Sequence, residues 1–294
     1  MTASEGRFGG VSGVRIFYRA WRPARPRGVV VVVHGFNAHS GHYAWAAEQL
    51  TAHGLAVHAL DLRGRGRSDG ERFYVDQFSD YVDDVASLVR IARSDASGLP
   101  VFLLGHSAGG VVACLYAVEH QAELAGLICE SFAFRLPAPD FALAVLKGLS
   151  HLAPHAHVLH LKNEDFSRDP NVVAAMNADP LIAHETQPTK TVAQLVLADE
   201  RLKSKHLGII AGTPPATNMA RNDINKDSPI NCLISLALPD PNTFRTPTSL
   251  ARCSDLAVAR FMKLMQAINK IITAISEKSF TYFIFPPSCF PSVK

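Results

Sequence analysis

The sequence predicts an α/β fold with a doubly wound, mostly parallel sheet and a helical insertion. Over the first two thirds of the 294 residues, strand-like and helix-like segments alternate, which is typical of a parallel sheet with helices on both faces. The stretch "GVVVVVH" at 28–34 is a continuous apolar run, as expected for a strand buried on both faces. The hydrophobic content of 48% is ample for a buried core.

The expected elements follow one another along residues 11–130. Strands are expected, in order, at 11–23 ("VSGVRIFYRAWRP"), 28–34, 55–64 ("LAVHALDLRG"), 100–105 ("PVFLLG") and 124–130 ("LAGLICE"). Helices are expected at 43–54, closed by Gly54, at 79–95 behind Ser79 as a plausible N-cap, and at 107–120.

Composition and charge exclude several classes of protein. The opening "MTASEGRFGG" has no apolar core of a signal peptide, and no apolar run approaches the length of a membrane helix. Five cysteines without CxxC spacing predict free thiols in a reducing compartment. The net charge of +3 forms no clustered basic patch, so nucleic-acid binding is not expected. We therefore expect a cytoplasmic protein.

The composition changes abruptly near Lys203. Up to this residue there are 22 valines and 17 glycines, whereas only 2 of each follow it. A divergent C-terminal domain is one interpretation. We favour the other, in which a different reading frame or an unrelated coding segment was joined near Lys203, because such shifts have little physical motive within one fold.

The segment "LLGHSAGGVV" at 103–112 carries the clearest chemical motif. It places Ser107 in a Gly-x-Ser-x-Gly pattern between an apolar strand and an apolar helix, which is the context of a nucleophile elbow. The small residues are needed because the backbone crowds around such a turn. Free N–H groups at the helix N-terminus would stabilise a developing oxyanion. We predict that Ser107 is a catalytic nucleophile.

A second N–H donor is expected from the loop after strand 28–34. By the general layout of hydrolases with this elbow, the backbone N–H groups of Ala108 and Phe36 form the oxyanion hole. His34, at the strand end, is expected to brace the loop by hydrogen bonds rather than to transfer protons.

Three stretches, in this order and spacing, resemble one branch of the α/β-hydrolases. They are "HGFNAHSGHYAWAAEQL", "LDLRGRGRSDGERFYVDQFSDYVDDV" and "LLGHSAGG", and they are similar to the monoacylglycerol lipase and lysophospholipase branch, also labelled serine aminopeptidase-like. The resemblance covers about residues 7–203. It implies hydrolysis of a small lipid ester, a monoacylglycerol or lysophospholipid, through an acyl-enzyme on Ser107, without a cofactor.

The resemblance also implies a division of the chain. Residues 1–131 form the N-terminal part of the hydrolase core, and residues 132–203 form a helical cap that would shelter an acyl chain and contact a lipid surface transiently. Residues 204–294 are an atypical tail in place of the C-terminal core, with a helix expected at 255–276 and loop or disorder elsewhere.

The acid and the histidine that this family supplies after the cap are not found. "HLGIIAGTPPA" imitates the acid-bearing strand and turn, but prolines stand where the aspartate belongs. His206 is the single histidine after Ser204, and it comes too early in the chain. Asp223 and Asp227 read as loop, so neither is assigned as the triad acid.

Other histidines and acids have structural interpretations. His106, beside the nucleophile, should point away from it, and Asp179 matches a cap motif and is expected to be a helix cap or structural acid. A cluster of four histidines invites a zinc interpretation, but no carboxylate or cysteine joins them at ligand spacing, so no metal site is predicted. The four are His151, His155, His157 and His160.

Three hypotheses for function follow. The chain is a working lipid-ester hydrolase with unrecognised partners for Ser107, a weakly active or inactive hydrolase from a disrupted or fused gene, or a non-catalytic relative that binds an apolar ligand under the cap. We expect little or no turnover, because a serine without its base loses orders of magnitude in rate.

Overall fold

The computed structural model describes residues 3–130, 140–167 and 169–212. These residues form the predicted α/β fold around a mostly parallel sheet. Residues 213–294, with the predicted helix at 255–276 and most of the predicted tail, lie outside the described residues.

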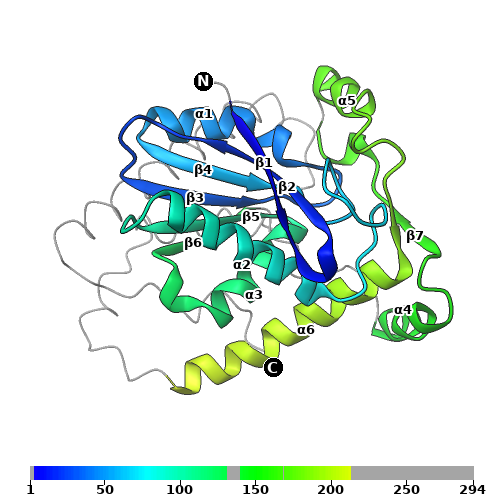
Figure 1. Cartoon of the computed structure of the whole chain (residues 1–294). Helices are drawn as coiled ribbons and strands as arrows, with labels where there is room; N and C mark the ends of the chain where they lie inside the picture. Colours follow the sequence, from blue (N-terminus) through cyan, green and yellow to red (C-terminus); the bar gives the residue numbers. More distant parts are fainter. Residues whose placement is uncertain (1–2, 131–139, 168, 213–294) are drawn as a thin grey trace, which may run out of the picture. The chain divides into compact units, whose positions relative to one another are not determined.

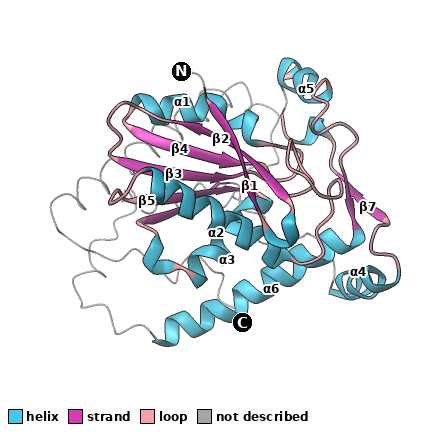
Figure 2. Cartoon of the chain, in the orientation of Figure 1, coloured by secondary structure: helices cyan, strands magenta, loops and turns pink. Residues whose placement is uncertain are grey.

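The main sheet has six strands in the order β1-β2-β4-β3-β5-β6. The neighbouring strands β4, β3, β5 and β6 run parallel, whereas β1 and β2 are antiparallel at one edge. Figure 2 shows these strands in magenta across the centre of the fold. The strands are β1 (Ser4–Gly9), β2 (Arg15–Trp21), β3 (Gly28–Val33), β4 (Leu55–Leu60), β5 (Val101–His106) and β6 (Gly126–Glu130).

Helices cover both faces of this sheet. The chain steps outward from β3 to β4 and then back past β3 to β5 and β6. Since parallel crossovers are right-handed, this reversal puts α1 (Ala44–Ala52) on one face and α2 (Phe78–Asp95) and α3 (Ala108–Glu119) on the other. In Figure 1 α1 and the α2–α3 pair flank the sheet in this way. Short 3-10 turns lie at Val11–Gly13, Ser40–Tyr43 and Gln121–Glu123.

The core lies on both sides of β3. All five valines of this strand, from Val29 to Val33, are buried, which confirms the interpretation of "GVVVVVH" as a central strand. Val29, Val31 and Val33 form one cluster with buried apolar residues of α2 and α3, such as Leu88 and Val111. Burial of this much apolar surface is the main favourable contribution to folding.

The chain beyond β6 forms a second structural region. Residues 140–188, which we call the inserted segment, contain α4 (Asp140–Leu152), β7 (His157–His160), a 3-10 turn (Asn163–Asp165), α5 (Pro170–Asn177) and β8 (Thr186–Pro188). Strands β7 and β8 pair as a separate antiparallel sheet. The long helix α6 (Thr189–Gly212) follows and contacts α2, α3 and α4. Its residues Leu195, Ala198 and Leu202 join the main core.

The structure corrects two details of the sequence analysis. Helix α2 begins at Phe78 with Gln77 at the N-cap position, so the prediction of Ser79 as N-cap is wrong. The Phe78 amide is instead satisfied by the side-chain oxygen of Gln194, at 2.9 Å, a contact from α6 that local sequence does not reveal. Strand β1 was also not predicted, because its alternation of exposed and partly buried residues is too weak for the pattern of a buried strand.

The segment compared above with an acid-bearing strand is helical. "HLGIIAG" at 206–212 continues α6, which runs without a break from Thr189 to Gly212. Within the described residues there is therefore no strand at this point of the chain.

Candidate active site

Ser107 lies at a sharp turn between β5 and α3. Its backbone has φ 54° and ψ −122°, a region that residues with a side chain seldom adopt and that stores strain. Two hydrogen bonds hold the turn: the Ser107 amide donates to the Glu130 carbonyl at 2.9 Å, and the Gly110 amide donates to the Ser107 carbonyl at 2.9 Å. The serine is partly exposed, so its hydroxyl is presented at the end of the strand as the motif predicts.

The glycines on either side of Ser107 are required by close packing. A Cβ atom built on Gly105 would lie 2.5 Å from the Gly109 carbonyl oxygen and 2.7 Å from the Ala113 Cβ. A Cβ atom on Gly109 would collide with the carbonyl oxygens of Val33 and His34. The turn and the end of β3 are therefore in direct backbone contact, and only glycine fits.

The loop after β3 packs against Ser107. A Cβ atom built on Gly35 would lie 2.8 Å from the Ser107 Cβ and 3.3 Å from its Oγ. Within the described residues, neither the Phe36 nor the Ala108 N–H donates a hydrogen bond to another protein group. The two amides predicted as oxyanion donors thus belong to segments that meet at Ser107, and neither has a protein acceptor within the described residues.

His34 is a structural histidine with a defined tautomer. Its Nε2 accepts a hydrogen bond from the Leu62 amide at 2.9 Å, so Nδ1 carries the proton and donates to the Gly35 carbonyl at 2.6 Å. Burial lowers the pKa of His34 to about 4, despite the opposing charge of Asp61. The neutral ring joins the end of β3 to the segment after β4 and has no free nitrogen for proton transfer.

His106, the residue before Ser107 at the end of β5, packs near Tyr43 of the 3-10 turn Ser40–Tyr43. The rings lie 6.3 Å apart in an edge-on arrangement. Burial lowers the pKa of His106, with the Glu130 carboxylate opposing the shift, and it raises the pKa of Tyr43. Both side chains are therefore neutral near pH 7. In the described part of the chain, no hydrogen bond connects His106 to the Ser107 hydroxyl.

The structure assigns no base to Ser107. Among the described residues, no histidine ring hydrogen-bonds its hydroxyl. The backbone of His206 falls in α6, but its side chain is not described. Asp223 and Asp227 lie outside the described residues.

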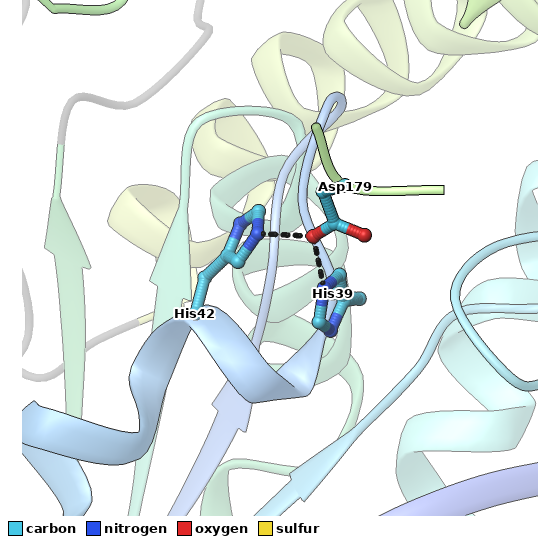
Figure 3. Close-up of side chains that lie close together, drawn as sticks. All are labelled: His39, His42 and Asp179. Atoms are coloured by element: carbon cyan, nitrogen blue, oxygen red, sulfur yellow. Dashed lines mark hydrogen bonds and ion pairs between the residues drawn. The ribbon is translucent and has the colours of Figure 1, made fainter. Parts of the chain in front are cut away.

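Asp179 joins two histidines of the "HSGH" stretch. Its Oδ2 lies 2.8 Å from His39 Nε2 and 2.9 Å from His42 Nε2 (Figure 3). Burial disfavours the charged carboxylate, but hydrogen bonds from His39, the Leu181 amide and His42 hold the pKa of Asp179 below its ordinary value. The acid connects the inserted segment to the turn at Ser40–Tyr43.

These three side chains resemble a metal site in composition but not in hydrogen bonding. Among the described residues, these three are the ones whose possible ligand atoms lie close enough together to hold a metal ion. The Gly41 amide donates to His39 Nδ1 at 3.0 Å, so the neutral ring carries its proton on Nε2, toward Asp179. A metal at Nε2 would need that nitrogen's lone pair and a proton on Nδ1 facing the Gly41 N–H. Hydrogen bonding therefore explains the group.

The four histidines considered for zinc do not converge. His155 Nδ1 pairs with Glu71 at 2.7 Å and its ring stacks on Tyr74. His157 bonds Thr186 within the β7–β8 sheet. Helix α4 ends at Leu152, before Pro154. Two ligands spaced four residues apart across that point therefore cannot lie on one face of the helix.

Sequence reasoning missed a buried network behind the Phe36 loop. Glu185, from the inserted segment, accepts hydrogen bonds from Arg65 and from the Asn37 amide, the latter at 2.9 Å. The Arg65 guanidinium lies 4.2 Å from the centre of the Phe36 ring. The available signal was the set of three arginines in "RGRGR", which begins three residues after the end of the buried strand β4, because buried arginines need acidic partners.

Comparisons with known proteins agree with this architecture. The sequence model of the family described as serine aminopeptidase, S33 (Hydrolase_4) matches residues 24–210. The chain is 41% identical over 198 residues to a monoacylglycerol lipase of Mycolicibacterium smegmatis, covering 66% of this chain and 71% of that protein. It is 37% identical over 174 residues to human monoglyceride lipase, covering 58% of this chain and 57% of the human protein.

The comparison with solved structures identifies the same fold. A monoacylglycerol lipase of Paleococcus ferrophilus superposes with a TM-score of 0.56 at 28% identity, over 70% of this chain and 73% of that one. A thermostable carboxyl esterase of Bacillus coagulans superposes with a TM-score of 0.58 at 25% identity, over 70% of this chain and 76% of that one. None of the helices in the described ranges has the length and apolar character of a transmembrane span.

Proposed function

The chain belongs to the serine aminopeptidase S33 family of α/β-hydrolases, and from this premise we propose that it is a carboxylic ester hydrolase with Ser107 as nucleophile. One observation carries the proposal. Ser107 is held at φ 54°, against the Gly35 backbone, between two amides that have no protein acceptor within the described residues. This is the local arrangement that acyl transfer to a serine requires.

The proposed reaction begins with attack of the Ser107 oxygen on the acyl carbonyl carbon. The carbonyl oxygen becomes an oxyanion, which the N–H groups of Phe36 and Ala108 stabilise. Collapse of this intermediate breaks the ester bond, releases the alcohol and leaves an acyl-serine, which water then hydrolyses. The serine proton must pass to a base that the described residues do not supply.

We propose that turnover is weak or absent in this chain. Within its 294 residues, one histidine follows Ser204, whereas the serine mechanism needs a histidine to take the serine proton. The composition change near Lys203 supports a disrupted or fused gene as the cause. A non-catalytic relative that binds an apolar ligand is the second candidate, and the lack of a described base for Ser107 supports it.

The proposed substrate is a monoacylglycerol or lysophospholipid-type ester. Monoacylglycerol lipases among the relatives support this class. Helix α4 supports a transient contact with a lipid surface, because one side of it exposes an apolar stripe. The stripe consists of Phe141 (73% exposed), Val145, Leu149 and Leu152 (86% exposed), spaced at helical intervals.

A cytoplasmic location is also proposed. The free thiols of Cys114 and Cys129 support it, since their sulfur atoms are hydrogen-bonded at 3.4 Å with no disulfide between them and disulfides are rare in reducing compartments. Cell fractionation followed by immunoblotting would test this location directly.

Release of p-nitrophenol from p-nitrophenyl butyrate by the purified full chain tests the function, with Ser107→Ala alongside. We expect slow release of p-nitrophenol that depends on Ser107 in the unaltered chain, because acylation itself needs the base, and only background release in the variant. Labelling by a fluorophosphonate, read as the mass of the intact protein, should likewise occur in the unaltered chain alone. Equal background rates and no labelling in both proteins would contradict the hydrolase proposal and favour the binding protein.

A further inference from the structure

A carboxylate of the inserted segment is buried against the loop that carries Phe36. Glu185 is 2% exposed, and its Oε1 accepts the Asn37 amide at 2.9 Å across 148 residues of sequence. We propose that Glu185 is a positioning residue that holds the Phe36–Asn37 turn against Ser107. This inference rests on the proposed function, in which the Phe36 N–H is an oxyanion donor.

Asn37 is also held from outside its own loop. Its φ of 51° is left-handed, a conformation that asparagine adopts more readily than most residues with a side chain. The Asn37 side-chain amide donates to the Leu161 carbonyl at 2.9 Å and to Asn163 at 3.2 Å. Both the backbone and the side chain of Asn37 are therefore held by the inserted segment.

Arg65 contacts both Glu185 and the Phe36 ring. Its guanidinium pairs with Glu185, donates to the Gln187 side-chain oxygen at 2.6 Å and lies 4.2 Å from the centre of the Phe36 ring. Phe36 thus rests on Arg65, while the next residue along the chain is tied to Glu185. The arginine also compensates the carboxylate charge, so that the network does not repel an oxyanion formed nearby.

The same protein contains a matched network away from Ser107. Asp84, fully buried, pairs with Arg63 at 2.8 Å and accepts the Val11 amide at 3.3 Å. It has the same parts as the Glu185 network, namely a buried carboxylate, an arginine and a backbone N–H. Its backbone donor lies in the turn between β1 and β2 rather than at the Phe36 loop.

Hydrogen exchange of the full chain tests the proposal with Glu185→Ala and the control Asp84→Ala. In Glu185→Ala we expect amides of the peptide spanning 35–38 to exchange about tenfold faster, as expected for the loss of a hydrogen bond to a charged acceptor. In Asp84→Ala the acceleration should appear around Val11 and not at 35–38. Unchanged exchange at 35–38 in Glu185→Ala, or equal acceleration in both variants, would overturn the proposal.

Two further variants separate positioning from general destabilisation. Glu185→Gln keeps an acceptor oxygen and should largely restore protection at 35–38 while losing the charge. If Glu185→Ala does not fold, the double variant Arg65→Leu with Glu185→Leu removes both charges together, with Arg63→Leu and Asp84→Leu as its control. The same contrast at 35–38 is expected between these double variants, and its absence would count against the role of Glu185.

The fluorophosphonate reaction adds a readout of the site itself. We expect Ser107 to be labelled about tenfold or more slowly in Glu185→Ala than in Asp84→Ala, because loss of an oriented oxyanion donor has effects of this size or larger. Equal labelling rates would overturn the positioning role. No labelling of the unaltered chain would contradict the proposed function instead, and the exchange result would then decide about Glu185 alone.

Discussion

Two turns meet at the candidate site, and they are stabilised in opposite ways. Ser107 and Asn37 both have left-handed backbones, with φ 54° and 51°. The Ser107 turn is held by small neighbours two residues away and by the adjacent strand β6. The Asn37 turn is held by Glu185 and Leu161, which lie 148 and 124 residues away. A positive φ is thus held by a local motif in one turn and by tertiary contacts in the other.

This difference implies that the two turns fail under different changes. Substitutions near Ser107 should disturb the elbow through steric contact with neighbouring backbone. Substitutions in the inserted segment should disturb the Asn37 turn and leave the elbow intact.

The largest effect is expected from Glu185→Ala. This change leaves Arg65, which is fully buried, without its acidic partner, and we expect the free energy of unfolding to fall by about 3–5 kcal/mol. Urea denaturation followed by circular dichroism measures it. Replacing both residues by leucine should recover most of the loss, and a loss below about 1 kcal/mol, the range of exposed pairs, would show that the pair is not buried in solution.

Acid should lower the stability of the fold through His34. Burial lowers the His34 pKa from 6.5 to about 4, so above pH 6.5 the ring is neutral in the folded and the unfolded chain. As the pH falls from 6.5 toward 4, His34 becomes protonated in the unfolded chain but stays neutral in the folded chain. About 3 kcal/mol of stability is therefore lost.

Urea denaturation between pH 7 and pH 5 tests this prediction against His34→Gln. The variant should be less stable at pH 7, and its stability should fall less steeply with acid. Parallel pH profiles for the two proteins would mean that His34 does not stay neutral in the fold.

Gly109→Ala tests the local support of the Ser107 turn. The added methyl group would collide with the Val33 and His34 carbonyl oxygens, and we expect a loss of about 1–3 kcal/mol. Gly148→Ala in α4 is the matched control, because nothing lies within 4 Å of the added methyl and alanine favours a helix by up to about 1 kcal/mol. Thermal denaturation should move the two melting temperatures in opposite directions, and a shift in the same direction would argue against the packing at Gly109.

The smallest effect is expected from His42→Ala. It removes one of the two imidazole contacts to Asp179, and because His42 is partly exposed, we expect a loss of about 1 kcal/mol or less. Thermal denaturation with His53→Ala as control measures it, since the His53 ring bonds the Gln49 carbonyl one turn earlier in the chain. A loss above that of Asp179→Ala would show that His42 has contacts beyond this carboxylate.

The sequence predicts the parts of the fold whose determinants are local. The apolar run of β3 and the motif around Ser107 each combine strong patterning with short-range steric needs, and both are confirmed as a buried strand and a left-handed turn. The alternation of strands and helices up to Glu130 is confirmed as well.

Elements that depend on distant partners were not predictable in the same way. The amide at the start of α2 is satisfied by Gln194, a residue of α6, rather than by a local cap. Glu185 and Asp179 carry no local pattern that names their partners, because these contacts exist only once the inserted segment has returned to the sheet.

The backbone angle at Ser107 has a consequence for the stability of the fold. A φ of 54° with ψ −122° is comfortable for glycine and costs other residues roughly 1–3 kcal/mol. Glycine at this position would relieve that cost, so the fold carries a serine here against its own stability.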